Sequence, residues 1–151
     1  MTYKTVKDIV DHARQLHEAL SRQYGELEQL TTSERAQLML SYLNRHEQRL
    51  AEALHEYEQG AGQGLLETWL QYAPDLDAGP LVEQIRDVDL NDVEAVVAAA
   101  LAVDEYLLQV YREIEEQADI EALREVARSL QQIESNEEHL LARDALRLHD
   151  F

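Results

Sequence analysis

Five histidine, aspartate and glutamate residues interrupt stripes of apolar residues that recur along the chain. His46, Asp104 and Glu137 each lie near the centre of such a stripe, and His17 lies on the flank of another. Glu134 precedes Glu137 by three residues, so on a helix both side chains project toward the same level. Burying a polar group without a partner costs about 1 to 3 kcal/mol, and a charge costs more. These residues are therefore expected to pair with one another or to bind a metal ion.

The depths of these residues along their predicted helices also agree. His17 and His46 lie 14 and 15 residues from Thr31, where the turn between their helices is expected, and Asp104 and Glu134 lie at similar depths in the second half of the chain. At about 1.5 Å per residue the four side chains are level to within one helical turn, about 5 Å. Two imidazoles and several carboxylates at one level suit iron, manganese or zinc. The predicted metal ligands are His17, His46, Asp104, Glu134 and Glu137.

Apolar residues that repeat every three or four positions predict four long amphipathic helices. Their expected ranges are about 5–30, 32–59, 91–116 and 119–148. Thr31 with Glu34, and Asn91 with Glu94, have the spacing of capping boxes, and Asp119 is an acceptable N-cap. The first two and the last two helices are therefore expected to form hairpins with short turns.

Glycine and proline concentrate in residues 60–90, between the second and third predicted helices. A segment of this length can run along a whole bundle and join two hairpins by one crossover. Residues 65–72 are a short helical candidate within it, and Trp69 and Tyr72 are expected to pack on the side of the bundle. The chain is therefore predicted to form a single all-α domain, residues 1–151, with the architecture of a four-helix bundle.

The two halves of the sequence echo each other. His17 precedes Tyr24 by seven residues, and Asp104 precedes Tyr111 by seven. Together with the crossover, this pattern resembles the ferritin-like superfamily, which includes rubrerythrins, bacterioferritins and di-iron carboxylate enzymes. The resemblance covers nearly the whole chain and implies a ferritin-like four-helix bundle, in which each hairpin supplies a carboxylate and a Glu-x-x-His pair. It also implies that Tyr24 or Tyr111 orients the metal ligands.

Three departures from the family pattern change the metal site that the resemblance implies. His17 stands where the family has a carboxylate. Leu43, three residues before His46, removes the bridging glutamate of the second helix, and Glu137, three residues after Glu134, replaces the second histidine. Instead of a pair of irons bridged by two glutamates, the resemblance implies one non-haem metal ion, and the enzyme class that it suggests is a non-haem metal oxidoreductase.

The same residues have a second interpretation that involves no metal. Buried histidines and carboxylates can pair with one another and with Tyr24, Tyr42 or Tyr111, forming a polar layer that only fixes the register of the helices. The protein would then be a metal-free interaction or regulatory module that binds partners through its acidic faces. Nothing in the sequence identifies the surfaces that close a hollow iron-storage shell, so a homodimer is favoured over a cage.

The remaining histidines give no support to other metal sites. His55 and His139 fall opposite the apolar stripes, so both are expected to face solvent. The chain's one literal Glu-x-x-His string, from Glu52 to His55, lies on that same outer side. No histidine has a glutamate or histidine four residues after it, which argues against a hemerythrin-type iron site.

The composition excludes several classes of function. Asp and Glu number 31 against 13 Lys and Arg, and the formal charge of −18 disfavours binding to nucleic acid or to an anionic membrane. The absence of cysteine excludes disulfides, thiolate metal sites and iron–sulfur clusters. No pattern indicates a nucleotide or haem cofactor. Without a signal peptide or an apolar run long enough to span a membrane, a cytoplasmic location is expected.

Overall fold

A computed structural model describes residues 4–71, 74 and 76–149, with side chains to residue 147. Within these residues the chain is all-α apart from one pair of two-residue strands. The elements in order are β1 (Lys4–Thr5), α1 (Val6–Leu30), α2 (Glu34–Gly60), α3 (Gln63–Leu66), β2 (Trp69–Leu70), α4 (Gly79–Asp87), α5 (Val93–Gln117) and α6 (Glu121–His149). The all-α fold class predicted from the helical periodicity is confirmed.

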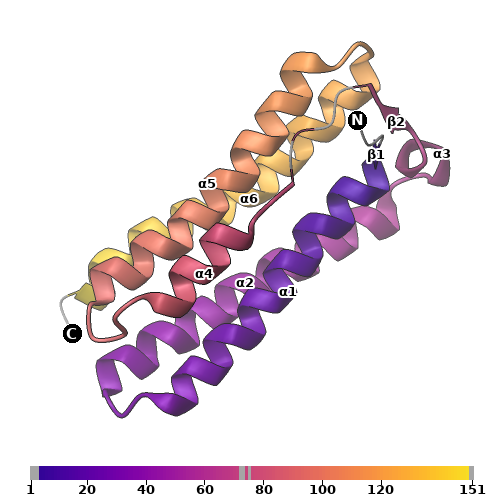
Figure 1. The fold of residues 1–151 in the computed structure, drawn as a ribbon. Helices are drawn as coiled ribbons and strands as arrows, with labels where there is room; N and C mark the ends of the chain where they lie inside the picture. Colours follow the sequence, from indigo (N-terminus) through magenta and orange to yellow (C-terminus); the bar gives the residue numbers. More distant parts are fainter. Residues whose placement is uncertain (1–3, 72–73, 75, 150–151) are drawn as a thin grey trace.

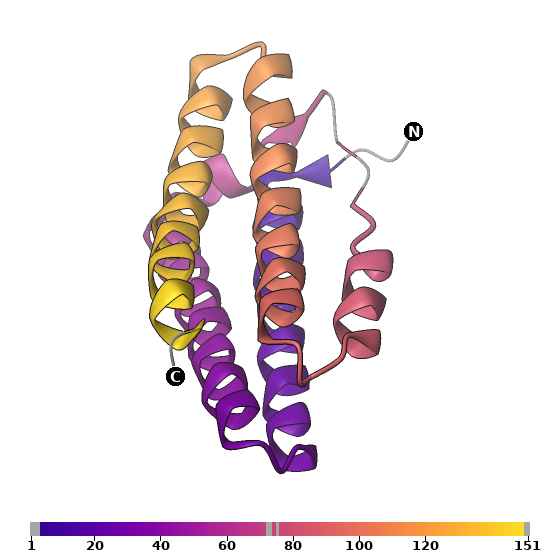
Figure 2. The same ribbon diagram turned by 90° about the vertical axis from the view of Figure 1, so that its left-hand side faces the viewer.

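The long helices α1, α2, α5 and α6 lie side by side as two antiparallel hairpins, and we call these four helices the bundle (Figure 1). α1 packs along α2, α5 packs along α6, and α2 also packs against α6. The connection from α2 to α5 returns along the outside of the bundle, with α4 beside α5 (Figures 1 and 2). α2 and α5 therefore run in the same direction. Each long helix spans the level halfway along the bundle.

The helix starts differ by one or two residues from those predicted. The side chain of Ser33 caps α2, whereas Thr31, the predicted cap, ends α1. The side chain of Asp92, not Asn91, caps α5. α6 begins at Glu121, two residues after its predicted start. The errors are small because several residues beside each turn have side chains able to cap a helix, and only the backbone decides which one does.

The crossover contains more regular structure than predicted. The short helix expected at 65–72 lies at 63–66 instead and is followed by β2. α4 was not predicted, because Gly79 and Pro80 were interpreted as helix breakers. Proline is favoured in the first turn of a helix, where its missing N–H needs no partner, and Pro80 occupies that position in α4. Ile85 is buried and fastens α4 to the core.

The crossover is also tied to the start of the bundle. β1 pairs with β2 in an antiparallel arrangement in which Lys4 lies opposite Leu70. The N–H of Val6 donates to the carbonyl of Thr68 at 3.0 Å. These backbone hydrogen bonds hold the first turn of α1 against the segment that follows α3.

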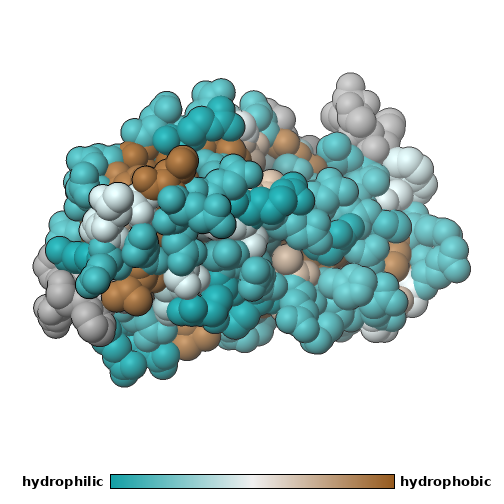
Figure 3. All heavy atoms as spheres, turned by 90° about the horizontal axis from the view of Figure 1, so that it is seen from below, coloured by the Kyte–Doolittle hydropathy of each residue, from teal (hydrophilic) through white to brown (hydrophobic). Residues whose placement is uncertain are grey.

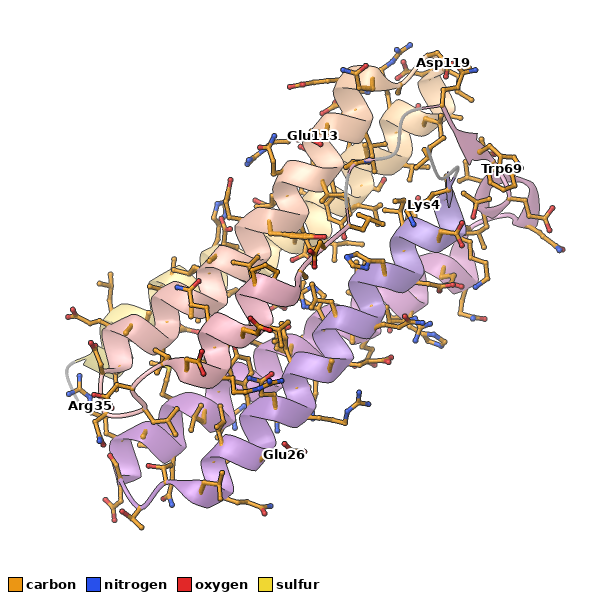
Figure 4. All side chains as sticks on the ribbon, viewed as in Figure 1. Lys4, Glu26, Arg35, Trp69, Glu113 and Asp119 are labelled. Carbon is orange, nitrogen blue, oxygen red and sulfur yellow. The ribbon has the colours of Figure 1, made fainter. Side chains whose placement is uncertain are left out.

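The face of the protein seen in Figure 3 is mainly hydrophilic, with smaller apolar areas. Trp69 is 60% exposed and projects from the end of the bundle (Figure 4). The expectation that it packs on the bundle side is wrong, and Tyr72 lies outside the described residues. No described helix combines the length and the apolar character needed to cross a bilayer.

Two polar contacts join α2 to α6. The hydroxyl of Tyr42 donates to Asp144 Oδ2 at 2.7 Å and to the carbonyl of Leu140 at 3.3 Å. Arg49 Nε donates to both carboxylate oxygens of Glu137, at 3.1 and 3.2 Å. The two contacts are spaced by seven residues on each helix, so together they fix the antiparallel register of this α2–α6 seam.

Replacing Tyr42 with phenylalanine is expected to lower the free energy of unfolding by about 0.5 to 1.5 kcal/mol, because the ring stays packed while its hydrogen bonds are lost. Urea unfolding at pH 7 measures the change. Tyr57→Phe is the matched control, since Tyr57 is also partly buried and its hydroxyl has no hydrogen bond to a described residue. Equal losses in the two variants would contradict the role of the Tyr42 hydroxyl.

Candidate metal centre

All four long helices contribute fully buried polar side chains to the middle of the bundle. His17 comes from α1, His46 and Glu47 from α2, Asp104 from α5 and Glu134 from α6, and each is 0% exposed. The buried core of the bundle is otherwise aliphatic and aromatic. We call these five residues the polar centre.

Buried apolar residues lie one helical turn before and after these polar side chains, on the same face of each helix. On α2, Leu43 and Leu50 lie one turn before and after His46, and both are fully buried. Ala13 and Leu20 flank the buried histidine of α1 in the same way. Helical periodicity alone therefore points the polar side chains at the bundle axis, where they meet one another instead of solvent.

His17 lies between two glutamates. Its Nδ1 is hydrogen-bonded to Oε2 of Glu47, and its Nε2 lies 2.6 Å from Oε1 of Glu134. An ionised carboxylate only accepts hydrogen bonds, so with both glutamates ionised both ring nitrogens must carry protons for both bonds to form. Burial lowers the pKa of His17, but the charges of Glu134 and Glu47 outweigh it and hold this pKa well above its ordinary value. In this arrangement His17 is an imidazolium.

His46 contacts Asp104 within the polar centre and Glu137 at its edge. Its Nε2 is hydrogen-bonded to Asp104 Oδ2 at 2.9 Å. Its Nδ1 lies 3.5 Å from Oε2 of Glu137, within ion-pair distance but without a hydrogen bond. Burial lowers the pKa of His46, whereas Asp104 and Glu137 raise it, and the result is a pKa of about 10. His46 is therefore also protonated at neutral pH.

Each of the three carboxylates in the polar centre keeps one oxygen that accepts no hydrogen bond from a described residue. These atoms are Glu47 Oε1, Asp104 Oδ1 and Glu134 Oε2. The hydroxyls of Tyr24 and Tyr111 are likewise unpaired, and both side chains are fully buried. A buried polar atom without a partner costs about 1 to 3 kcal/mol. Five such atoms in one part of the core call for partners, such as buried water or a bound ion.

The polar centre has more acidic than basic side chains, three against two. With both imidazoles protonated and all three carboxylates ionised, it would carry one net negative charge. Burial raises the pKa of Glu47 and of Asp104, because a low-dielectric environment disfavours their charged forms. Burial and the nearby carboxylates also raise the pKa of Tyr24 and Tyr111 well above the ordinary value, so both hydroxyls stay protonated. A cation is the ligand that this excess of negative charge favours.

Three members of the polar centre could hold a metal ion. One ligand atom from each of His17, Glu47 and Asp104 lies within 4.8 Å of the others. Imidazole nitrogen and carboxylate oxygen are common donors to zinc, iron and manganese. The unpaired oxygens of the two carboxylates are consistent with such a ligand set.

Four of the five predicted ligands belong to the polar centre, and their role as metal ligands stays a prediction. The fifth, Glu137, lies at the edge, where 15% of its side chain is exposed. Burial raises the pKa of Glu137, but the nearby His46 and the hydrogen bonds from Arg49 outweigh it, so this pKa lies below its ordinary value. His55 and His139 are exposed as predicted, so neither belongs to the centre.

Glu47 was missed by the sequence interpretation. Leu43 is buried where a glutamate was expected, but the conclusion that α2 contributes no glutamate is wrong, because Glu47 supplies one a turn later. The signal was present: Glu47 lies four residues after Leu43, seven after Leu40 and seven before Leu54, all of which are buried. Leu38, on the same helix, is 50% exposed. An apolar stripe drawn through Leu38 therefore turns the inferred inner face of the helix away from Glu47.

The chain matches no protein-family model, and no curated protein or solved structure is significantly similar to it. Any assignment of function therefore rests on the residues and geometry of the polar centre.

The metal-free protein is expected to lose stability as the pH rises from 7 to 10. A histidine whose pKa rises on folding stabilises the folded state fully below its unfolded pKa of 6.5, and this contribution is lost as the pH passes the folded value, about 10 for His46. The raised pKa values of Glu47 and Asp104 also make stability fall with rising pH, but starting from their ordinary values of 4.5 and 3.8.

Thermal unfolding in the presence of a chelator, followed by circular dichroism, measures this pH dependence. His46→Gln is expected to flatten the decline in melting temperature, whereas His55→Gln, at an exposed position, is expected to leave it unchanged. A wild-type melting temperature that stays constant between pH 7 and 10 would contradict the assignment of imidazolium groups to the polar centre.

Proposed function

We propose that the protein binds one non-haem metal ion, iron, manganese or zinc, in the middle of the bundle. The observation that carries this proposal is the unpaired oxygen on each of three fully buried carboxylates, which come from three different helices. The residues assigned to the site are His17, His46, Glu47, Asp104 and Glu134. His17, Glu47 and Asp104 form its inner group, because their ligand atoms lie closest together.

A metal ion accounts for the charge and the unpaired atoms at once. Protons on the two imidazoles supply two positive charges in the metal-free protein, but they leave the second oxygen of each carboxylate unused. A divalent cation carries the same charge at one point and accepts lone pairs from several oxygens together. Because a ligating imidazole must lose its proton from the coordinating nitrogen, binding through His17 exchanges a proton for the metal ion.

The other members of the polar centre would orient the inner group. His46 donates to Asp104 Oδ2 and so leaves Oδ1 of that carboxylate free. Glu134 accepts from Nε2 of His17 and fixes the plane of that ring. Contacts of this kind hold metal ligands in one orientation and raise their affinity for the ion.

The connectivity of the bundle supports our further proposal that the chain is a divergent ferritin-like protein. Two hairpins joined by one long crossover are typical of ferritin-like bundles, whose metal sites form from side chains on facing helices. Bound iron or manganese would supply one-electron redox chemistry, so a non-haem metal oxidoreductase is the enzyme class proposed. The chain's own contribution is a fully buried ligand set, with the hydroxyls of Tyr24 and Tyr111 as the nearby unpaired groups.

The wild-type protein, purified without a chelator or a histidine tag and then reconstituted, is expected to contain close to one equivalent of iron, manganese or zinc by elemental analysis. Glu47→Gln and Asp104→Asn each keep the size of the side chain but replace a ligand charge, so both variants are expected to lose most of the metal. Glu52→Gln is the matched control, because Glu52 lies on the same helix as Glu47 but is exposed.

Metal-free wild-type protein, even after reconstitution, would contradict the proposal. If the two ligand variants then changed only the stability, the result would favour the metal-free polar layer and an interaction or regulatory module.

A further inference from the structure

Glu137 joins the polar centre to solvent. Its side chain is 15% exposed, whereas every member of the polar centre is 0% exposed. Oε2 of Glu137 lies 3.5 Å from the unpaired Nδ1 of His46. The other ring nitrogen of His46 is hydrogen-bonded to Asp104, which carries an unpaired oxygen of its own. A continuous series of metal-binding groups therefore runs from the surface of the α2–α6 seam to the buried site.

A positively charged side chain occupies the outer end of this series. Arg49 Nε donates to both oxygens of Glu137, and the Arg49 side chain is 42% exposed. The guanidinium carbon of Arg49 lies 5.8 Å from the ring centroid of Tyr42, whose hydroxyl anchors the same seam. Arg49 thus satisfies the carboxylate of Glu137 and places a positive charge where a cation would arrive.

We infer that metal ions reach the polar centre through the α2–α6 seam, with Glu137 as the first group that captures them. A divalent cation replaces the guanidinium of Arg49 as the partner of Glu137, His46 releases its Nδ1 proton to solvent, and the ion passes by way of that nitrogen to the buried carboxylates. The exchange leaves Glu137 paired with a positive charge throughout. Glu137 is thereby an access residue and not a ligand of the final site. This inference rests on the proposed metal-binding function.

The expected consequence is kinetic. A residue that lies on the route but outside the final site changes the rate constants for binding and release by the same factor, so the dissociation constant stays the same. Charged groups at the mouth of a site change the association rate of an ion by about tenfold or more. Glu137 should therefore speed both the binding and the release of the metal ion, whereas Arg49 should slow both.

Stopped-flow absorbance with Co²⁺ as the probe tests the inference in the full-length, metal-free protein. Glu137→Gln is expected to lower the rate constants for Co²⁺ binding and release by on the order of tenfold, with one ion still bound at unchanged affinity. Arg49→Gln is expected to raise both. The matched controls are Glu115→Gln and Arg128→Gln, which break an exposed glutamate–arginine pair between α5 and α6 with the same changes in net charge.

Four outcomes would overturn the inference, and they are distinguishable. Unchanged rates in Glu137→Gln, with normal Co²⁺ capacity, would contradict the route alone. A weaker affinity with an unchanged association rate would make Glu137 a ligand of the final site. Equal slowing in Glu115→Gln would assign the effect to net charge. Failure of the wild-type protein to bind Co²⁺ at all would contradict the proposed function itself, and the inference with it.

Discussion

Three carboxylates and two imidazoles share one level of the bundle interior, and their charges have to be compensated there because water is excluded. In the metal-free arrangement His17 bridges Glu47 and Glu134, and His46 pairs with Asp104. Each of these contacts joins a different pair of helices: α1 to α2, α1 to α6, and α2 to α5. The contacts of His17 with Glu134 and of His46 with Asp104 thus also tie the two hairpins together. A purely apolar core would pack the same helices without this dependence on protonation or on a bound cation.

The other contacts described above hold the helices in the positions that bring the polar centre together. The contacts of the α2–α6 seam set the register in which Glu134 reaches His17, and the strand pair and α4 hold the crossover against the bundle. Removing one member of a buried charged network leaves its partner unpaired, which costs about 3 to 5 kcal/mol. Such a network is therefore sensitive to substitution, whether it holds a metal ion or protons.

Much of the architecture and part of the site could be predicted from the sequence. The regular spacing of apolar residues predicted the four long helices, because helix formation follows periodicity and burial. It also placed His17, His46, Asp104 and Glu134 at one depth, since depth depends only on counting residues from the turns. Two features were missed for physical reasons. The position of Glu47 depends on helix rotation, which a stripe wrongly extended to Leu38 shifted by part of a turn, and α4 depends on packing against α5, which no local pattern reveals.

Anomalous diffraction from crystals soaked in Mn²⁺ or Zn²⁺ tests most directly whether the polar centre holds a metal ion. We predict one strong anomalous peak between the four long helices, at about 2.0 to 2.2 Å from donor atoms of Glu47 and Asp104, together with a His17 ring that no longer bridges two glutamates. Anomalous peaks confined to the acidic outer faces, with the His17 bridge intact, would contradict a metal site in the polar centre.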